Sequence, residues 1–213
     1  MLRAHLFTFD VGAAFLEGKA DTKMYAWLPG SIDIDGVSKR IEILGNWYGS
    51  KQAGKIWNDL FDEIMIKMDF ERCIDNPCLY KWTEADEYIY QTVHVDDGAG
   101  ISSSKELADE FLQRFLQHVR KAVLMHEVKL YLGMDIERNS DGTMFRVSQS
   151  RYIQENFKDY NRVYRTPMAT SINLRITEPN NNNNSLLPIT GKLRYLADRT
   201  RPDILEATEE VST

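Results

Sequence analysis

The chain has 213 residues, with 26 lysines and arginines against 32 aspartates and glutamates, so its formal net charge at pH 7 is −6. Hydrophobic residues make up 43% of the sequence, which is enough for a buried core and excludes global disorder. No apolar run has the length of a membrane span or a signal peptide, so we expect an intracellular protein without membrane contact. The acidic balance argues against a free-standing nucleic-acid binder.

The first third of the chain predicts strands followed by one long helix. Leu6–Val11 is an apolar stretch that contains Asp10 close to its end, which is typical of a short strand that ends in a carboxylate. Met24–Leu28 and Lys39–Leu44 predict a second pair of strands. From Ala53 to Phe70 the apolar residues recur at helical spacing and leave the charged residues on the other side.

The middle of the chain predicts a hairpin and a second helix. Leu79–Thr83 and Tyr88–Val95 flank the polar stretch Glu84–Glu87, and the second strand runs directly into Asp96-Asp97-Gly98. We expect Gly98 to let the backbone bend where a side chain would obstruct it. Ser104 is the expected N-cap of a helix that extends to Val119.

The last part of the chain predicts a hairpin, helical segments and an exposed linker. Glu127–Arg138 and Thr143–Ser148 bracket a turn signal at residues 139–142, so they predict a hairpin, and a short helix is expected at Ser150–Tyr160. Glu178–Leu187 contains an uninterrupted asparagine run and predicts an exposed linker. The final segment, Ile189–Val211, is typical of a helix.

Three carboxylates carry the chemistry that the sequence suggests. An acidic pair such as Asp96-Asp97 is most often a solvated turn, but here it stands between an apolar strand and a glycine-rich stretch. If the strand that carries Asp10 lies beside it, three carboxylates come together and require a cation. No calcium-loop pattern is present, so Mg²⁺ shared with substrate phosphates is the better hypothesis. Two such ions would stabilise a phosphoryl displacement.

A series of short strings resembles one known family. They occur in the family's order: FDVGAAFLEG (9–18), WYGSKQAGKIW (47–57), DNPCLY (75–80), HVDD (94–97), LGMDI (132–136), SQSRYI (148–153), Thr166-Pro167-Met168 and LRYLADRTRPDI (193–204). Together they are similar to the reverse transcriptases of copia-type LTR retrotransposons. Each string alone is weak, whereas eight in order across almost the whole chain are not expected by chance.

The resemblance implies a palm domain, an antiparallel sheet backed by helices in the α/β (α+β) class. It implies that Asp10 and Asp96 bind two Mg²⁺ ions, or Mn²⁺, and that Asp97 is the third acid. The activity implied is RNA-directed DNA synthesis on an RNA or DNA template-primer with deoxynucleoside triphosphates. The family also implies a location in cytoplasmic virus-like particles or in the nucleus.

Further residues gain a role only through this resemblance. Phe15 falls where an aromatic ring excludes a 2′-hydroxyl, although its apolar neighbours also fit core packing. Gly49 and Gln52 fall where the family contacts the template and nucleotide, although a turn before a helix explains them as well. Leu132–Asp135 resembles the hairpin that grips the primer end, and a strand entering a glycine bulge fits equally. The family usually has tyrosine at the position of His94, and histidine would add a titratable charge there.

The resemblance also divides the chain. Residues 1–165 would form the palm with a partial thumb-like region, residues 166–188 a linker, and residues 189–213 the start of a connection toward ribonuclease H. The fingers and ribonuclease H regions of the family would have to act in cis or in trans. Two alternatives to a working polymerase stay open: a folded but inactive retroelement remnant, and a metal-dependent phosphohydrolase.

Overall fold

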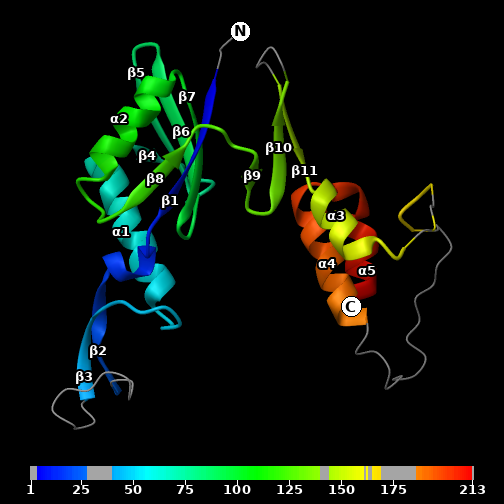
Figure 1. Cartoon of the computed structure of the whole chain (residues 1–213), viewed down its shortest axis with the longest axis horizontal. Coiled ribbons are helices and arrows are strands. Elements are labelled where there is room, and N and C mark those ends of the chain that lie inside the picture. Colours follow the sequence, from blue (N-terminus) through cyan, green and yellow to red (C-terminus); the bar gives the residue numbers. More distant parts are fainter. Residues whose placement is uncertain are drawn as a thin grey trace. The chain divides into compact units, whose positions relative to one another are not determined.

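The computed structural model describes residues 4–27, 40–139, 144–160, 162, 165–168 and 186–212 (Figure 1). It divides into two compact units, of which the first ends at Val128 and the second begins at Lys129. Helices and antiparallel strands both contribute to the fold, so the predicted α/β class is confirmed. Within the described residues, no helix is both long enough and apolar enough to cross a membrane. The functional domain boundaries at residues 165 and 188 stay predictions.

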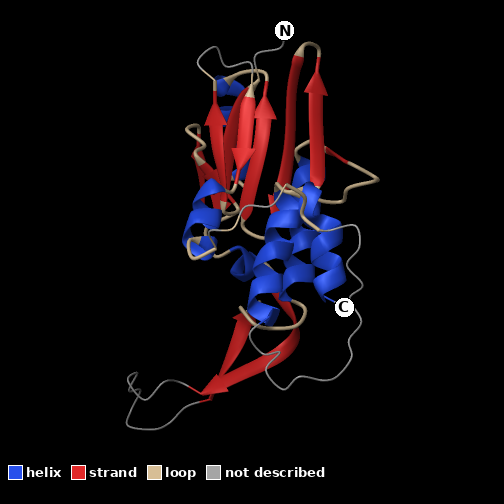
Figure 2. Ribbon diagram, turned by 90° about the vertical axis from the view of Figure 1, so that its right-hand side faces the viewer, coloured by secondary structure: helices blue, strands red, loops and turns tan. Residues whose placement is uncertain are grey.

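Six strands form one sheet in the first unit, in the order β4-β5-β6-β7-β1-β8, and every neighbouring pair is antiparallel (Figure 2). The strand β1 has a partner on each side, so it is a central strand. The strands span His5–Val11 (β1), Glu71–Arg72 (β4), Leu79–Glu84 (β5), Glu87–His94 (β6), Asp97–Ser102 (β7) and Ala122–Met125 (β8).

The predicted hairpin between residues 79 and 95 is present as β5 and β6. Its loop is shorter than expected, because Glu84 and Glu87 pair with each other across the two strands. Only Ala85 and Asp86 remain in the turn, and Ala85 has a φ of 51°. A two-residue loop between antiparallel strands favours such positive φ values, because they match the twist of the hairpin.

Two helices follow the sequence predictions closely. The first, α1, spans Ala53–Lys67 and ends before the predicted Phe70, because Asp69 has a φ of 67°, outside the helical region. The second, α2, spans Lys105–Phe115 and begins at the predicted cap, where the hydroxyl of Ser104 accepts a hydrogen bond from the backbone N–H of Leu107 at 3.1 Å. It ends before the predicted Val119, because the chain turns after Phe115.

Helices α1 and α2 pack against one face of the sheet. Alternate residues of a strand share a face, so β1 turns Phe7, Phe9 and Val11 toward the helices, and each is at most 1% exposed. The ring of Phe9 lies 6.4 Å from that of Phe61 on α1 and 5.5 Å from that of Phe111 on α2, measured between centroids. An aromatic core therefore fixes β1, while the residues between these three point to the opposite face.

Two glycines of β7 make room for this aromatic core. Gly98 and Gly100 lie directly opposite Phe9 and Phe7. A Cβ atom on Gly98 would stand 2.0 Å from Cζ of Phe9, and one on Gly100 would stand 2.6 Å from Cζ of Phe7. The expected reason for Gly98 was therefore wrong: it lies within a strand, and the backbone bends at Val95, whose φ is 60°.

The second predicted pair of strands forms a separate two-stranded sheet, in which β2 spans Lys19–Trp27 and β3 spans Arg40–Gly45. The expected end residues Leu28 and Lys39 lie outside the described residues. A short 3-10 helix, η1 (Ala14–Glu17), joins β1 to β2. This arrangement places η1 directly after the strand that carries Asp10.

The second unit combines a three-stranded sheet with helices. The strand predicted over residues 127–138 is broken, because Leu132 and Gly133 have φ values of 46° and 73° and form a turn. The predicted helix at residues 150–160 ends at Phe157, and the turn residues 140–143 lie outside the described residues. The elements are β9 (Leu130–Tyr131), β10 (Met134–Arg138), β11 (Phe145–Ser148), α3 (Ser150–Phe157), α4 (Leu186–Arg199), η3 (Pro202–Ile204) and α5 (Leu205–Ser212).

The end of the chain differs from the prediction in two respects. Leu187 belongs to α4 rather than to the expected linker, whose asparagine run lies outside the described residues. The expected single helix over residues 189–211 is interrupted after Arg199, where η3 begins at Pro202. Proline has no N–H to continue the helical ladder, so a new helical segment starts there.

Candidate functional site

Asp10 and Asp97 lie directly opposite each other on the neighbouring strands β1 and β7. Residues opposed across an antiparallel pair have Cβ atoms about 5 Å apart and share one face of the sheet. That face is the one turned away from Phe9 and Val11, which are buried beneath the helices. Strand register alone therefore brings two of the predicted acids together on the face that α1 and α2 leave free.

Asp96 lies in the turn between β6 and β7, and its backbone carbonyl accepts a hydrogen bond from the N–H of Val11 at 2.9 Å. Partial burial raises the pKa of the Asp97 carboxyl, and the negative charges of Asp96 and Asp10 raise this pKa further. His94, which is paired with Asp97 across the hairpin, lowers it. Asp10 and Asp96 are thus close enough to act electrostatically on Asp97.

The fit of a cation can be judged from this donor set. Among the residues that the structure describes, no group of three or more His, Cys, Asp or Glu side chains is arranged to hold a metal ion. The acids at positions 10, 96 and 97 therefore do not form a closed cage as they stand. Mg²⁺, however, is commonly bound by one or two carboxylates together with substrate phosphates. Asp10 and Asp97 fit that partial role, since their crowded like charges favour a bound cation.

Phe15 packs against the hydrophobic core and also lines a cleft next to this acidic turn. It stands on η1, partly buried, and its ring centroid is 4.8 Å from that of Tyr48. A cleft of about 230 Å³ is lined by Phe15, Trp57, Cys78, His94 and Val95, among others. The predicted aromatic residue is therefore in the immediate surroundings of the hairpin that carries the acids.

Gly49 and Gln52 lie between β3 and α1. Gly49 has a φ of 93°, and a Cβ on it would meet no atom within 4 Å. The side-chain amide of Gln52 donates hydrogen bonds to Asp21 Oδ1 at 3.1 Å and to Thr22 Oγ1 at 3.0 Å. These contacts tie the start of α1 to β2, so Gln52 has a structural partner that the sequence did not indicate.

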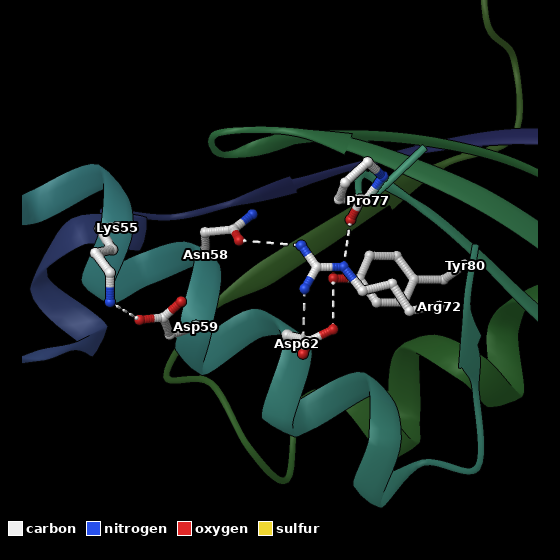
Figure 3. Close-up of polar contacts among 7 residues, drawn as sticks. All are labelled: Lys55, Asn58, Asp59, Asp62, Arg72, Pro77 and Tyr80. Atoms are coloured by element: carbon white, nitrogen blue, oxygen red, sulfur yellow. Dashed lines mark hydrogen bonds and ion pairs between the residues drawn. The ribbon is translucent and has the colours of Figure 1, made fainter. Parts of the chain in front are cut away.

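A polar cluster that the sequence did not reveal joins α1 to β4 and β5 (Figure 3). Asp62 accepts a hydrogen bond from the hydroxyl of the fully buried Tyr80 at 3.0 Å and forms an ion pair with Arg72 at 3.4 Å. Arg72 also donates to the carbonyl of Pro77 at 2.7 Å and to Asn58 Oδ1 at 3.3 Å. Burial raises the pKa of the Tyr80 hydroxyl, and its hydrogen bond to Asp62 adds to the rise.

This cluster holds the DNPCLY segment against α1. Asn58 and Asp62 are spaced four residues apart on α1, a spacing that places two side chains on one face of a helix. That face lies opposite the apolar side of the helix, yet both residues contact the guanidinium of Arg72. The sequence could have indicated this contact, because a polar stripe on the helix is followed closely by a single arginine.

Three of the sequence strings meet in the second unit. The hydroxyl of Tyr195 on α4 donates a hydrogen bond to the carbonyl of Leu132 at 2.7 Å, and a Cβ on Gly133 would stand 2.6 Å from that hydroxyl. Asp135 forms an ion pair with Arg151 at 3.1 Å. The hairpin predicted to grip a primer is therefore supported by residues of the later motifs, and Gly133 allows Tyr195 to approach closely.

Residues 3–173 match the family model described as reverse transcriptase (RNA-dependent DNA polymerase). The retrovirus-related Pol polyprotein from transposon TNT 1-94 of Nicotiana tabacum is 26% identical over 220 residues, which cover 95% of this chain and 16% of that protein. The putative transposon Ty5-1 protein YCL074W of Saccharomyces cerevisiae is 29% identical over 205 residues, which cover 92% of this chain and 65% of that protein.

The chain thus spans less than two thirds of the length of these relatives. The family match extends over more than half of the chain and includes the strands of Asp10 and Asp97 and the turn that carries Asp96. It agrees with the resemblance found in the sequence strings. The chain belongs to the reverse transcriptase (RNA-dependent DNA polymerase) family.

Proposed function

We propose that this chain forms the palm of an RNA-directed DNA polymerase and adds deoxynucleotides to a primer 3′-hydroxyl on an RNA or DNA template. The observation that carries the proposal is the register of β1 and β7, which sets Asp10 opposite Asp97 on the face free of α1 and α2. The family match supports the reaction class. In the proposed reaction the hydroxyl attacks the α-phosphate of the nucleotide, and pyrophosphate leaves.

Asp10, Asp96 and Asp97 would hold two Mg²⁺ ions, or Mn²⁺, together with the phosphates of the nucleotide. Such ions stabilise the attacking and the leaving oxygens of an in-line displacement. The carboxylates supply the negative charge that binds them. Burial raises the pKa of Asp97 most, and the charges of Asp96 and Asp10 add to the rise, so a bound cation would offset that repulsion. The free face of the sheet would have to receive the primer-template duplex.

We assign the remaining predicted residues as follows. Phe15 would lie under the sugar and exclude a 2′-hydroxyl, a role supported by its place in the cleft next to His94 and Val95. Gly49 and Gln52 would lie near the template-nucleotide pair, and Gln52 would be oriented by its bonds to β2. Fingers and ribonuclease H regions, in cis or in trans, would complete the polymerase. The protein would be located inside the cell.

A primer-extension assay on the purified chain tests this proposal. We expect a template-dependent and Mg²⁺-dependent product that Asp96→Asn and Asp97→Asn abolish. Glu84→Gln is the matched control, because Glu84 is an exposed acid at the opposite end of the same sheet. A folded chain that gives no product, even with fingers and ribonuclease H segments added, would instead indicate an inactive remnant. Release of phosphate or nucleotide without a primer would indicate a phosphohydrolase.

The role of Phe15 has its own test. Phe15→Val should let the enzyme incorporate ribonucleotides, while deoxynucleotide incorporation changes much less. Because Tyr48 packs against the same ring, Tyr48→Phe serves as a control that keeps the aromatic contact. Unchanged sugar discrimination in Phe15→Val would remove this assignment and leave the acids untouched.

A further inference from the structure

The turn that carries Asp96 contains an unusual backbone. His94 pairs with Asp97, so only Val95 and Asp96 connect β6 to β7. Val95 has a φ of 60°, a conformation that a β-branched residue rarely adopts. In two-residue hairpin loops the positions with positive φ usually take glycine or asparagine. A valine in this conformation is strained, so other contacts must hold it.

The indole of Trp57 provides such a contact. Its Nε1–H donates a hydrogen bond to the carbonyl oxygen of Val95, which is 38 residues away in the sequence. Trp57 is 2% exposed and packs its ring against Phe61 on the same helix, with 5.7 Å between the centroids. Strand β1 holds the next carbonyl, that of Asp96, through the N–H of Val11 at 2.9 Å. Both carbonyls of the turn are therefore bound from outside the hairpin.

Packing alone does not fix this turn. The side chain of Val95 is 41% exposed, and the cleft of about 230 Å³ opens beside it, between the turn and the start of α1. Gly54 and Trp57 line the α1 side of the cleft. With open space next to Val95, a directional bond rather than side-chain contact determines where the turn lies.

We propose that Trp57 is a positioning residue that holds the Val95–Asp96 turn in its strained conformation and thereby places Asp96 and Asp97 opposite β1. The inference rests on the proposed function in so far as those acids bind a divalent cation. It assigns to Trp57 a role beyond core packing: its ring fills the core, and its N–H sets the geometry of the acidic turn. The hydrogen bond from the indole nitrogen thus compensates for the strained backbone of Val95.

The test uses the full chain and three variants: Trp57→Phe, Val95→Gly and the double variant. Trp57→Phe removes the N–H and keeps an aromatic ring, while Val95→Gly removes the strain, because glycine adopts positive φ readily. Trp82→Phe is the matched control, since it deletes the same atoms at another site of the first unit. Two quantities are measured: hydrogen exchange of the Val11 amide, which reports the contact with Asp96, and the affinity for Mn²⁺ alone.

We expect Trp57→Phe to accelerate exchange of the Val11 amide about tenfold beyond any acceleration seen at the central amides of β5 and β6, which corresponds to about 1.4 kcal/mol. The Mn²⁺ affinity should fall by a similar factor. The double variant should return both quantities to within about twofold of the unmodified chain, because the turn then keeps its conformation without the bond. Trp82→Phe should change neither beyond its effect on global stability.

Uniform acceleration across the sheet in Trp57→Phe, or no recovery in the double variant, would overturn the inference and reduce Trp57 to a core residue. If Trp57→Phe does not fold, hydrogen exchange of the Trp57 indole N–H is measured in the unmodified chain. Exchange as slow as that of core amides supports the hydrogen bond to Val95, and rapid exchange refutes it. If the unmodified chain binds no Mn²⁺, the proposed function fails, whereas the Val11 amide still tests the role of Trp57.

Discussion

Replacing Gly98 by alanine tests whether the close approach of β7 and β1 is essential to the fold. The added Cβ would stand 2.0, 2.1 and 2.5 Å from three ring carbons of Phe9. Non-bonded carbon atoms are not found closer than about 3 Å, so the ring would have to move by about 1 Å or more. That movement is obstructed, because Phe61, Phe111 and Phe115 surround Phe9 with centroid distances of 6.4, 5.5 and 5.8 Å.

The size of the effect follows from two limits. Overpacking a well-filled core costs about 1–3 kcal/mol, and losing a buried phenylalanine altogether costs about 3–5 kcal/mol. Because Phe9 is 1% exposed and has no free side to move toward, we expect Gly98→Ala to reduce the free energy of unfolding by about 3 kcal/mol. The acid at position 97 would shift with it, so the proposed cation binding should weaken as well.

Urea unfolding followed by circular dichroism measures this change. The matched control is Gly54→Ala on α1, where an added Cβ meets no atom within 4 Å and helix propensity predicts a gain of about 0.5–1 kcal/mol. A double variant with Phe9→Leu should show a favourable coupling of more than about 1 kcal/mol, because the smaller side chain relieves the clash. An unfolding midpoint of Gly98→Ala at or above that of the unmodified chain would refute the packing argument.

Three further outcomes are expected. The folded state raises the pKa of Asp97, so it binds that proton more tightly than the unfolded chain does, and this contribution to stability is lost as the pH rises through the pKa in the folded state. Asp97→Asn should therefore stabilise the metal-free chain at neutral pH and flatten that part of the stability profile; urea titrations at several pH values check the sign. Ser104→Ala removes the bond to the N–H of Leu107 and should cost about 1 kcal/mol in thermal unfolding, with no change at the acids. Tyr80→Phe leaves the carboxylate of Asp62 without its hydroxyl partner and should cost about 1.5–3 kcal/mol, and a double-mutant cycle with Asp62→Asn would return no coupling if the bond is absent.

The sequence predicted the parts of the fold that depend on local pattern. The helix at residues 53–67 follows from apolar residues at helical spacing, and the cap at Ser104 follows from its hydroxyl and the apolar face behind it. The sequence suggested only that the strands of Asp10 and Asp97 could be neighbours, not that the two residues lie directly opposite each other. Its register is set by Phe9 lying over Gly98, a contact between strands that no single segment displays.

Tertiary contacts account for what the sequence did not predict. Trp57 was assigned only to the apolar face of its helix, and nothing in the pattern shows that its indole nitrogen reaches the carbonyl of Val95. Aligning the two strands that flank Val95 could have indicated a two-residue loop, because only Val95 and Asp96 remain between the paired residues. A valine in such a loop would then be expected to have a strained backbone. Likewise, Arg72 and Asp62 come from separate segments and meet only after α1 packs on the sheet.

The central position of β1 makes the length of this strand more critical than most of its individual residues. One residue inserted or deleted within β1 reverses the side of every residue beyond it: either Phe7 and Phe9 leave the helices, or Asp10 is pushed among them, where a carboxylate has no partner. Because β7 and β8 flank β1, neither end can slip without breaking ladder bonds. Insertion or deletion of a single codon in this stretch should therefore abolish both folding and the proposed cation binding, whereas many substitutions would affect only one of the two.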